Sequence, residues 1–265
     1  LAVSYLSVFG LKTKKFNNQI KEKITSLNQK INLELKEVKF LLNPLDLSFN
    51  AKTLETKIII DNNLLELESL RSKISLKSFI KTEFIIDNIN ISTKTIKIND
   101  IIKLARSFDN STQLFLINKI IKEGIIVGDI NLNFDGNGNI KNDYSIKGYV
   151  KAGKLGFFKK YNITNLNFFF NINKKNYFLE EINGNLNDLK FSSASLKIKE
   201  KKNLFSIKGK FLTEEKNDYS IILKETYPIF LKNIDIKNIQ LESNNNFSFD
   251  ISKKFKISKL SLKSE

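Results

Sequence analysis

The side chains that carry most enzymatic chemistry are missing from this chain of 265 residues. It contains no histidine and no cysteine, and methionine and tryptophan are absent as well. Histidine is the usual acid–base catalyst near neutral pH, and cysteine is a common nucleophile and a ligand of zinc and iron–sulfur clusters. The sequence therefore excludes histidine acid–base catalysis, thiol nucleophiles, zinc sites and iron–sulfur clusters.

Two pairs of adjacent carboxylates, Glu180-Glu181 and Glu214-Glu215, are the remaining candidates for acid–base work. On a strand, neighbouring side chains point to opposite faces, so neither pair forms a catalytic dyad by itself. Solvated edge charges are the simpler interpretation. Serine is common, but the G-x-S-x-G nucleophile elbow is absent and no histidine could activate a hydroxyl group. We predict that the chain is not an enzyme.

The run Asp135-Gly136-Asn137-Gly138-Asn139 has some features of a calcium-binding loop. An EF-hand loop needs a bidentate carboxylate at its twelfth position, which is Ile146 in this sequence. A dinucleotide-binding fingerprint needs a third glycine and a following helix, whereas this run opens a strand. A tight turn between two strands explains the run better, and we predict neither a metal nor a cofactor.

Apolar and polar residues alternate at every second position over most of the chain, from about Ile31 to Leu262. The segment from Ser195 to Lys199 is one example and the segment from Asn246 to Ser252 is another. A strand has a side-chain period of two, so each such run has one apolar and one polar face. The alternation predicts a mainly β protein that must cover a large apolar surface.

Two regions follow helical periodicity instead, and the others are predicted strands. One helix is expected over residues 12–30, and a central helical pair is expected at about 100–123, beginning near Asn99-Asp100 and ending at Gly124. A phase slip at Glu37 predicts a bulge, and Asn43-Pro44 predicts a turn. The expected strands lie at 31–35, 38–42, 45–51, 53–61, 64–70, 72–78, 82–91, 93–99, 125–135, 142–151, 153–159, 162–173, 176–186, 188–200, 203–213, 217–225, 227–243 and 246–262.

The chain is strongly basic, with a net charge of +16. This charge favours anionic partners such as lipid headgroups or nucleic acid, although the codon bias of an AT-rich genome also explains abundant Lys, Asn, Ile and Phe. Proteins that bind single-stranded nucleic acid expose aromatic side chains among basic ones. Most of the 22 phenylalanines here are instead in phase with leucine and isoleucine, so we predict that nucleic acid is not a partner.

The first eleven residues are uncharged and mainly apolar, and Lys12, Lys14 and Lys15 follow at once. A transmembrane helix needs about 20 apolar residues, so this segment cannot span a bilayer alone. It could be the end of a truncated membrane anchor, an interfacial helix or a buried helix. We interpret residues 1–30 as a membrane-proximal helical segment, and residues 31–265 as a repetitive β domain with a helical insertion at about 100–123.

Two architectures satisfy the alternation. Two sheets could press their apolar faces together in a sandwich, or one long sheet could curl into a groove with an apolar wall. Burial of apolar surface stabilises by about 25 cal/mol per Å², so an open groove of many strands needs an apolar guest to fill it. Periodicity alone does not separate the two architectures.

The segment from Leu33 to Val38, followed by Asn43 to Phe49, resembles the start of AsmA-like proteins, a family that includes TamB- and YhdP-related proteins. The layout of strands from Lys57 to Ala105, and the basic-bordered apolar segment that precedes a helix, are similar to that family as well. The resemblance is strongest over residues 1–110. It implies the N-terminal portion of a bridge-like lipid transfer protein related to chorein-type proteins.

This resemblance implies an elongated antiparallel sheet that is curved into a groove, in a periplasmic protein anchored to the bacterial inner membrane. Such a protein would bind phospholipid acyl chains without catalysis and carry them toward the outer membrane, with a membrane and envelope proteins as partners. Basic residues along the rim would favour anionic lipid. The alternative is a β-sandwich or solenoid module with a dry core and a protein partner, which would serve as a scaffold or in adhesion. Under the lipid hypothesis, the in-phase apolar residues are candidates for acyl-chain contact: Leu47, Phe49, Ile58, Ile60, Phe168, Phe170, Leu196, Ile198, Phe247 and Phe249.

Overall fold

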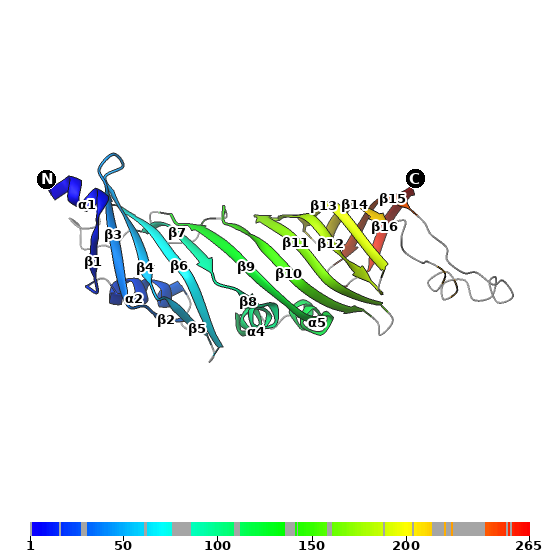
Figure 1. The fold of residues 1–265 in the computed structure, drawn as a ribbon, viewed down its shortest axis with the longest axis horizontal. Helices are drawn as coiled ribbons and strands as arrows, with labels where there is room; N and C mark the ends of the chain where they lie inside the picture. The colour runs from blue at the N-terminus through cyan, green and yellow to red at the C-terminus, as the bar shows by residue number, and fades with distance from the viewer. Residues whose placement is uncertain are drawn as a thin grey trace. The chain divides into compact units, whose positions relative to one another are not determined.

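The computed structural model shows a mainly β protein with a few short helices, as the alternation predicts (Figure 1). It describes residues 2–15, 17–27, 31–60, 63–75, 86–108, 112–135, 141, 143–157, 161–187, 189–202, 204–213, 220, 224, 242–252, 254 and 256–265. The helices are α1 (Ala2–Val8), α2 (Asn17–Leu27), α4 (Ile98–Phe108) and α5 (Thr112–Ile120). None of the helices in the described part of the chain is long and apolar enough to cross a bilayer.

Sixteen strands occur in the described residues. Eight of them precede or lie beside the central helices: β1 (Leu11–Thr13), β2 (Ile31–Glu34), β3 (Glu37–Asn43), β4 (Ser48–Leu54), β5 (Lys57–Ile60), β6 (Asn63–Ser75), β7 (Ile86–Thr93) and β8 (Ile96–Lys97). The other eight follow the helices: β9 (Ile121–Asn133), β10 (Ser145–Phe157), β11 (Tyr161–Asn173), β12 (Asn176–Leu186), β13 (Leu189–Lys201), β14 (Leu204–Thr213), β15 (Ser243–Ser252) and β16 (Ile257–Ser264).

The strands form one open antiparallel sheet in the order β1-β3-β4-β6-β7-β9-β10-β11-β12-β13-β14-β15-β16. Strand β5 pairs with β2 and β6, and β8 pairs with β9, away from this path. The chain divides into two compact units: unit 1 is residues 1–114 with 126–148, and unit 2 is residues 115–125 with 149–265.

Unit 1 buries one face of its strands in a closed apolar core. The register places Phe40 opposite Ala51, Ala51 opposite Ser72, and Ser72 opposite Ile89, so these side chains share one face. Helix α2 contacts β2 and contributes the buried Ile20 to the same cluster. On β3 and β4 the intervening residues point to the other face, as the alternation requires. Strand β6 breaks the alternation between Leu67 and Ser69, where its register with β7 shifts.

The phase slip predicted at Glu37 is a break between two strands, because the chain changes its pairing partner there. Strand β2 pairs with β5, whereas β3 pairs with β4. The same interruption divides β4 from β5 at Glu55, which has a φ of +50°. Buried Thr53 bridges the interruption, since its Oγ1 accepts a hydrogen bond from Leu70 N at 3.2 Å and also bonds to Thr56.

The described strands of unit 2 form an up-and-down series in a single layer. From β11 to β16, each described strand packs against the next one in sequence. The predicted turn at Lys174-Lys175 joins β11 to β12. The apolar face of this layer is therefore not matched by a second sheet within the described residues.

Several element boundaries differ from the sequence prediction. Helix α2 begins at Asn17, not at residue 12, because Leu11–Thr13 pairs with β3 as strand β1. Helix α5 ends at Ile120, since the β-branched Ile120-Ile121 leads into β9, and Gly124 lies within that strand.

The strand divisions also differ in places. Residues 64–70 and 72–78 were expected as two strands, but β6 is continuous to Ser75, and β10 likewise continues through the break expected at residue 152. The turn expected at residues 243–245 is part of β15, because Ser243 and Asn245 pair with β14. Most of the expected strands 217–225 and 227–243, and most of the turn at residues 135–139, lie outside the described residues.

Candidate functional site

Unit 2 contains an apolar cavity of about 440 Å³ on one face of its sheet. Its wall consists almost entirely of carbon atoms from β11 to β15. The lining residues are Ile163, Ile182, Leu186, Leu189, Lys190, Phe191, Ser193, Leu196, Phe211, Thr213 and Phe247. Cavities of about 300–1,000 Å³ with apolar walls are typical of ligand-binding sites.

The cavity lies where the strands change phase. On β12, Leu179 pairs with Leu196 and Ile182 pairs with Ser193, although residues three apart point to opposite faces of a regular strand. Glu181, between them, has a φ of +52°, which turns Ile182 to the face that carries Leu179. Strand β13 makes the matching change between Ser192 and Leu196, where its register with β14 shifts. Bulges of this kind bend a sheet locally, and here they hollow its apolar face.

Asparagine side chains hold these irregularities across three neighbouring strands. Asn167 on β11 accepts a hydrogen bond from Ala152 N on β10 (3.0 Å), and it donates to Asn183 Oδ1 on β12 (3.0 Å) and to Asn165 O (2.7 Å). Asn183 in turn donates to Glu181 O at 3.2 Å. Ala152, Asn165 and Glu181 all have positive φ, so three of these four hydrogen bonds are made to a backbone group of a residue in the left-handed region.

Two aromatic rings of the cavity wall, those of Phe191 and Phe247, lie against glycines on neighbouring strands. Gly184 pairs with Phe191, and Gly209 pairs with Phe247, so each glycine faces an aromatic ring on the next strand. A Cβ atom at Gly184 would lie 3.3 Å from the Phe191 ring, and one at Gly209 would lie 3.0 Å from the Phe247 ring. Both rings therefore lie over the backbone of the neighbouring strand, at positions where a larger residue would meet them.

The polar groups in the wall are largely engaged with the protein itself. Ser193 Oγ donates to Ser195 O at 3.3 Å, and Thr213 Oγ1 bonds to Ser243 Oγ at 2.8 Å. Lys190 is exposed to solvent and also lines the cavity. The wall is therefore suited to a hydrocarbon guest.

Among the described residues of unit 2, the one titratable group with a shifted pKa is Asp250, on the other face of the sheet. A hydrogen bond from Ser206, helped by Lys259 with its Nζ at 3.3 Å from Oδ2, holds the pKa of Asp250 below its usual value. Asp250 is adjacent to Phe249 on β15, so the two side chains point to opposite faces. This carboxylate stabilises the β15–β16 edge and takes no part in the cavity.

The six candidate residues predicted in unit 2 share the face that carries the cavity. Leu196 and Phe247 line it. Phe170 is in line with Leu179 and Leu196 across three strands, and its ring lies 6.5 Å from that of Phe168. Ile198 on β13 and Phe249 on β15 both pair with Ile207 on β14, which lies between them. This second row is two residues along the strands from the row of Leu196 and Phe247, on the same face.

The four candidate residues predicted in unit 1 lie in three different environments. Ile58 and Ile60 are buried in the closed core. Phe49 packs against that core, with its ring edge-on to Phe40 at 6.2 Å. Leu47 is exposed in the turn between β3 and β4. The structure does not bring these four side chains together at a cavity.

Most residues of the cavity wall were not among the candidates predicted from the sequence, because those candidates came only from segments with unbroken alternation. Ile182, Phe191 and Phe211 are needed for the cavity, but two of these three are on strands that change phase. The signal in the sequence is the slip itself: Leu179 is followed by Ile182, and Ser193 by Leu196, at odd spacing. Such a slip marks a bulge, and bulges often lie next to binding sites.

Neither a scan of protein-family models nor searches of curated proteins and of solved structures finds a match to this chain.

Proposed function

We propose that the apolar face of unit 2 is a non-catalytic binding surface for the acyl chains of phospholipid. The observation that carries the proposal is the cavity, whose wall is carbon on a face that no second sheet covers among the described residues. Each methylene group that leaves water for such a wall contributes about 0.8 kcal/mol. A chain of several methylene groups therefore binds without any specific polar contact.

The surface next to the cavity extends the proposed site. The row Phe170, Leu179 and Leu196 continues through Gly209 to Phe247, and it crosses five adjacent strands. We propose that the sheet curves into a groove along these rows, so that acyl chains slide from one strand to the next while headgroups stay in water. The ammonium group of Lys190 would then attract the phosphate of a headgroup.

The cellular role in the proposal follows from the resemblance to AsmA-like proteins. We propose that the protein is periplasmic, is held at the inner membrane through its N-terminal segment, and passes phospholipid toward the outer membrane. The scaffold alternative has no equivalent support in unit 2, because a dry interaction module would not need a hollow apolar face.

A single tryptophan placed in the cavity tests the proposal, since the chain contains no tryptophan of its own. In F247W the indole would lie in the wall, and titration with monomeric dibromostearate is expected to quench its fluorescence by contact with the brominated chain. The matched control is F178W, because Phe178 pairs with Lys197 on the opposite face of the same sheet. This second tryptophan is expected to keep its fluorescence.

Selective and saturable quenching of F247W supports an acyl-chain site. Equal quenching of both tryptophans would indicate nonspecific partitioning, and no quenching of either would show that the cavity stays dry. Both of these results contradict the proposal.

A further inference from the structure

Four cationic side chains stand in one row across four neighbouring strands of unit 1. Lys12 on β1 pairs with Lys39 on β3, Lys39 pairs with Lys52 on β4, and Lys52 pairs with Arg71 on β6. Strands in a sheet are about 4.8 Å apart, so the row is about 14 Å long. Like charges directly opposite each other destabilise a sheet, which makes such a row unusual without an anionic partner.

The row lies on the face of unit 1 that points away from its core. Lys39 is between Val38 and Phe40, and Lys52 is between Ala51 and Thr53, all four of which are buried. Alternation along a strand then directs both lysines outward.

Little acidic charge compensates this row. Lys12 Nζ lies 3.9 Å from Glu37, a long ion pair. Within the described residues, Lys39, Lys52 and Arg71 form no ion pair, in contrast to Lys73, which bonds to Asp46 at 3.0 Å. The row is therefore a local excess of positive charge.

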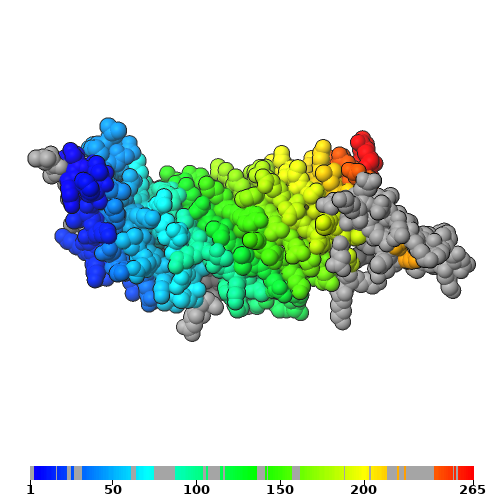
Figure 2. Space-filling view, viewed as in Figure 1, coloured from blue at the N-terminus to red at the C-terminus, as the bar shows by residue number. Residues whose placement is uncertain are grey.

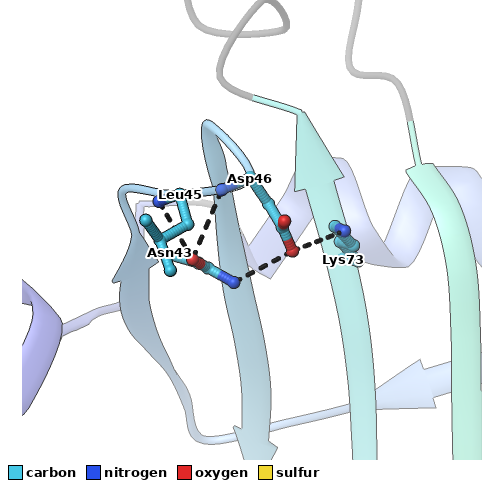
Figure 3. A network of polar contacts seen from close by, with 4 residues as sticks. All are labelled: Asn43, Leu45, Asp46 and Lys73. Atoms are coloured by element: carbon cyan, nitrogen blue, oxygen red, sulfur yellow. Dashed lines mark hydrogen bonds and ion pairs between the residues drawn. The ribbon is translucent and has the colours of Figure 1, made fainter.

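At one end of the same strands, the β3–β4 turn presents two leucines to solvent. Leu45 is 94% exposed and Leu47 is 65% exposed. The turn is rigid, because Asn43 Oδ1 accepts hydrogen bonds from Leu45 N (3.2 Å) and Asp46 N (3.4 Å), and Asp46 is held by Asn43 Nδ2 and Lys73 (Figure 3). A rigid turn loses little conformational entropy when its leucines enter an apolar medium.

Helix α1 presents more apolar surface at this end. Leu11 pairs with Phe40 and the helix contacts β3, so the chain before Leu11 lies beside the last residues of β3. Val3, Tyr5, Val8, Phe9 and Leu11 are all exposed. In the space-filling view, α1 and the projecting β3–β4 turn are neighbours on the surface (Figure 2).

We propose that the cationic row, the β3–β4 turn and α1 together form a docking surface for an anionic lipid bilayer. Leu45, Leu47 and the apolar residues of α1 enter the interface, as interfacial helices do to a depth of about 5–10 Å. The row lies four residues from Asn43, about 13 Å along the strand, so its long side chains reach toward the headgroup phosphates. This surface is separate from the cavity, and its failure would leave the acyl-chain proposal intact.

A bilayer fits this surface better than nucleic acid does. Both partners are polyanionic, but nucleic-acid binders place stacking aromatics among their cations. The row contains none, and the exposed apolar side chains gather instead at the tip of the strands, where they would meet the acyl boundary of a bilayer.

Flotation with vesicles tests the proposal on the whole chain. The wild type is expected to bind vesicles of equal parts phosphatidylglycerol and phosphatidylcholine, and to bind pure phosphatidylcholine vesicles weakly. Each cation near an anionic bilayer surface raises the binding affinity about five-fold. The row variant K39Q/K52Q/R71Q lacks three of the four cations, so its affinity for these vesicles is expected to fall roughly 100-fold. The matched control is K197Q/K208Q/K210Q, which removes three exposed charges from unit 2 and is expected to lose less than about three-fold.

A second variant separates insertion from charge. L45S/L47N replaces two exposed side chains, and it is expected to weaken binding roughly 50-fold at both low and physiological ionic strength, because burial of leucine is not screened by salt. The thermal unfolding midpoint of the row variant is expected to equal or exceed that of the wild type, since like-charge repulsion is removed.

Three results would overturn the proposal. Equal loss in the row variant and its control would show a general effect of net charge. Unchanged binding of L45S/L47N would remove the turn from the interface. Tighter, row-dependent binding to a single-stranded oligonucleotide than to the vesicles would identify the surface as a nucleic-acid site.

Discussion

Replacing Ile74 by alanine is expected to destabilise unit 1 by about 4 kcal/mol, the largest stability effect predicted for the chain. Ile74 is fully buried, with 0% of its surface exposed, and it faces Phe49 across the β4–β6 pair. The truncation leaves a cavity in a core that is closed to solvent. Hydrogen exchange of the backbone amides of β3, β4 and β6 is expected to accelerate several hundred-fold, since about 1.4 kcal/mol corresponds to a factor of ten.

The control for this substitution is L64A on the same strand. Leu64 is 55% exposed, so its truncation is expected to cost less than about 0.5 kcal/mol. Similar exchange rates in I74A and L64A would contradict the closed core of unit 1. They would also remove the contrast between a dry core in unit 1 and an open apolar face in unit 2.

Replacing Leu196 by glutamate is expected to weaken acyl-chain binding about 100-fold while leaving the fold largely intact. Leu196 lies in the cavity wall between Leu179 and Gly209, so a bound chain would be pressed against the new carboxylate. Bringing an unpaired polar group against hydrocarbon costs about 2–3 kcal/mol. Without a bound chain, the partly exposed position lets the carboxylate reach water, so the thermal unfolding midpoint should change little.

The matched control is A194E, two residues away on the same strand. Ala194 is exposed and does not line the cavity, so this variant is expected to bind a fluorescent phosphatidylglycerol within about three-fold of the wild type. Equal affinities of L196E and A194E for the labelled lipid would place the acyl site elsewhere. Unfolding of L196E would instead show that Leu196 belongs to a closed core.

Alternation was sufficient to predict the mainly β class and the shared face of unit 2. Leu196 and Ile198, like Phe247 and Phe249, are two residues apart on regular stretches of strand, and the period of two places each pair on one face. The shared face of each pair follows from local backbone geometry. The alignment of these faces across β13, β14 and β15 depends on the register of strand pairing.

The cavity and the cationic row depend on information that the period of two does not contain. Ile182 joins the cavity only because Glu181 adopts a positive φ, and nothing about a glutamate side chain signals that conformation in advance. Lys12 and Arg71 are far apart in the sequence and lie in one row only because four strands pair in one particular register. The spacing of residues in the sequence therefore identified the apolar faces. The cavity in unit 2 and the cationic row of unit 1 could be found only from the conformation and pairing of the strands.

The lipid content of the purified chain tests the central claim most directly. The whole chain would be purified without detergent, and native mass spectrometry would compare the wild type with L196E. We predict phospholipid adducts on the wild type, which are lost from L196E and restored to the wild type when delipidated protein is mixed with phosphatidylglycerol. A folded wild-type chain that carries no lipid, and takes up none after mixing, would contradict the account.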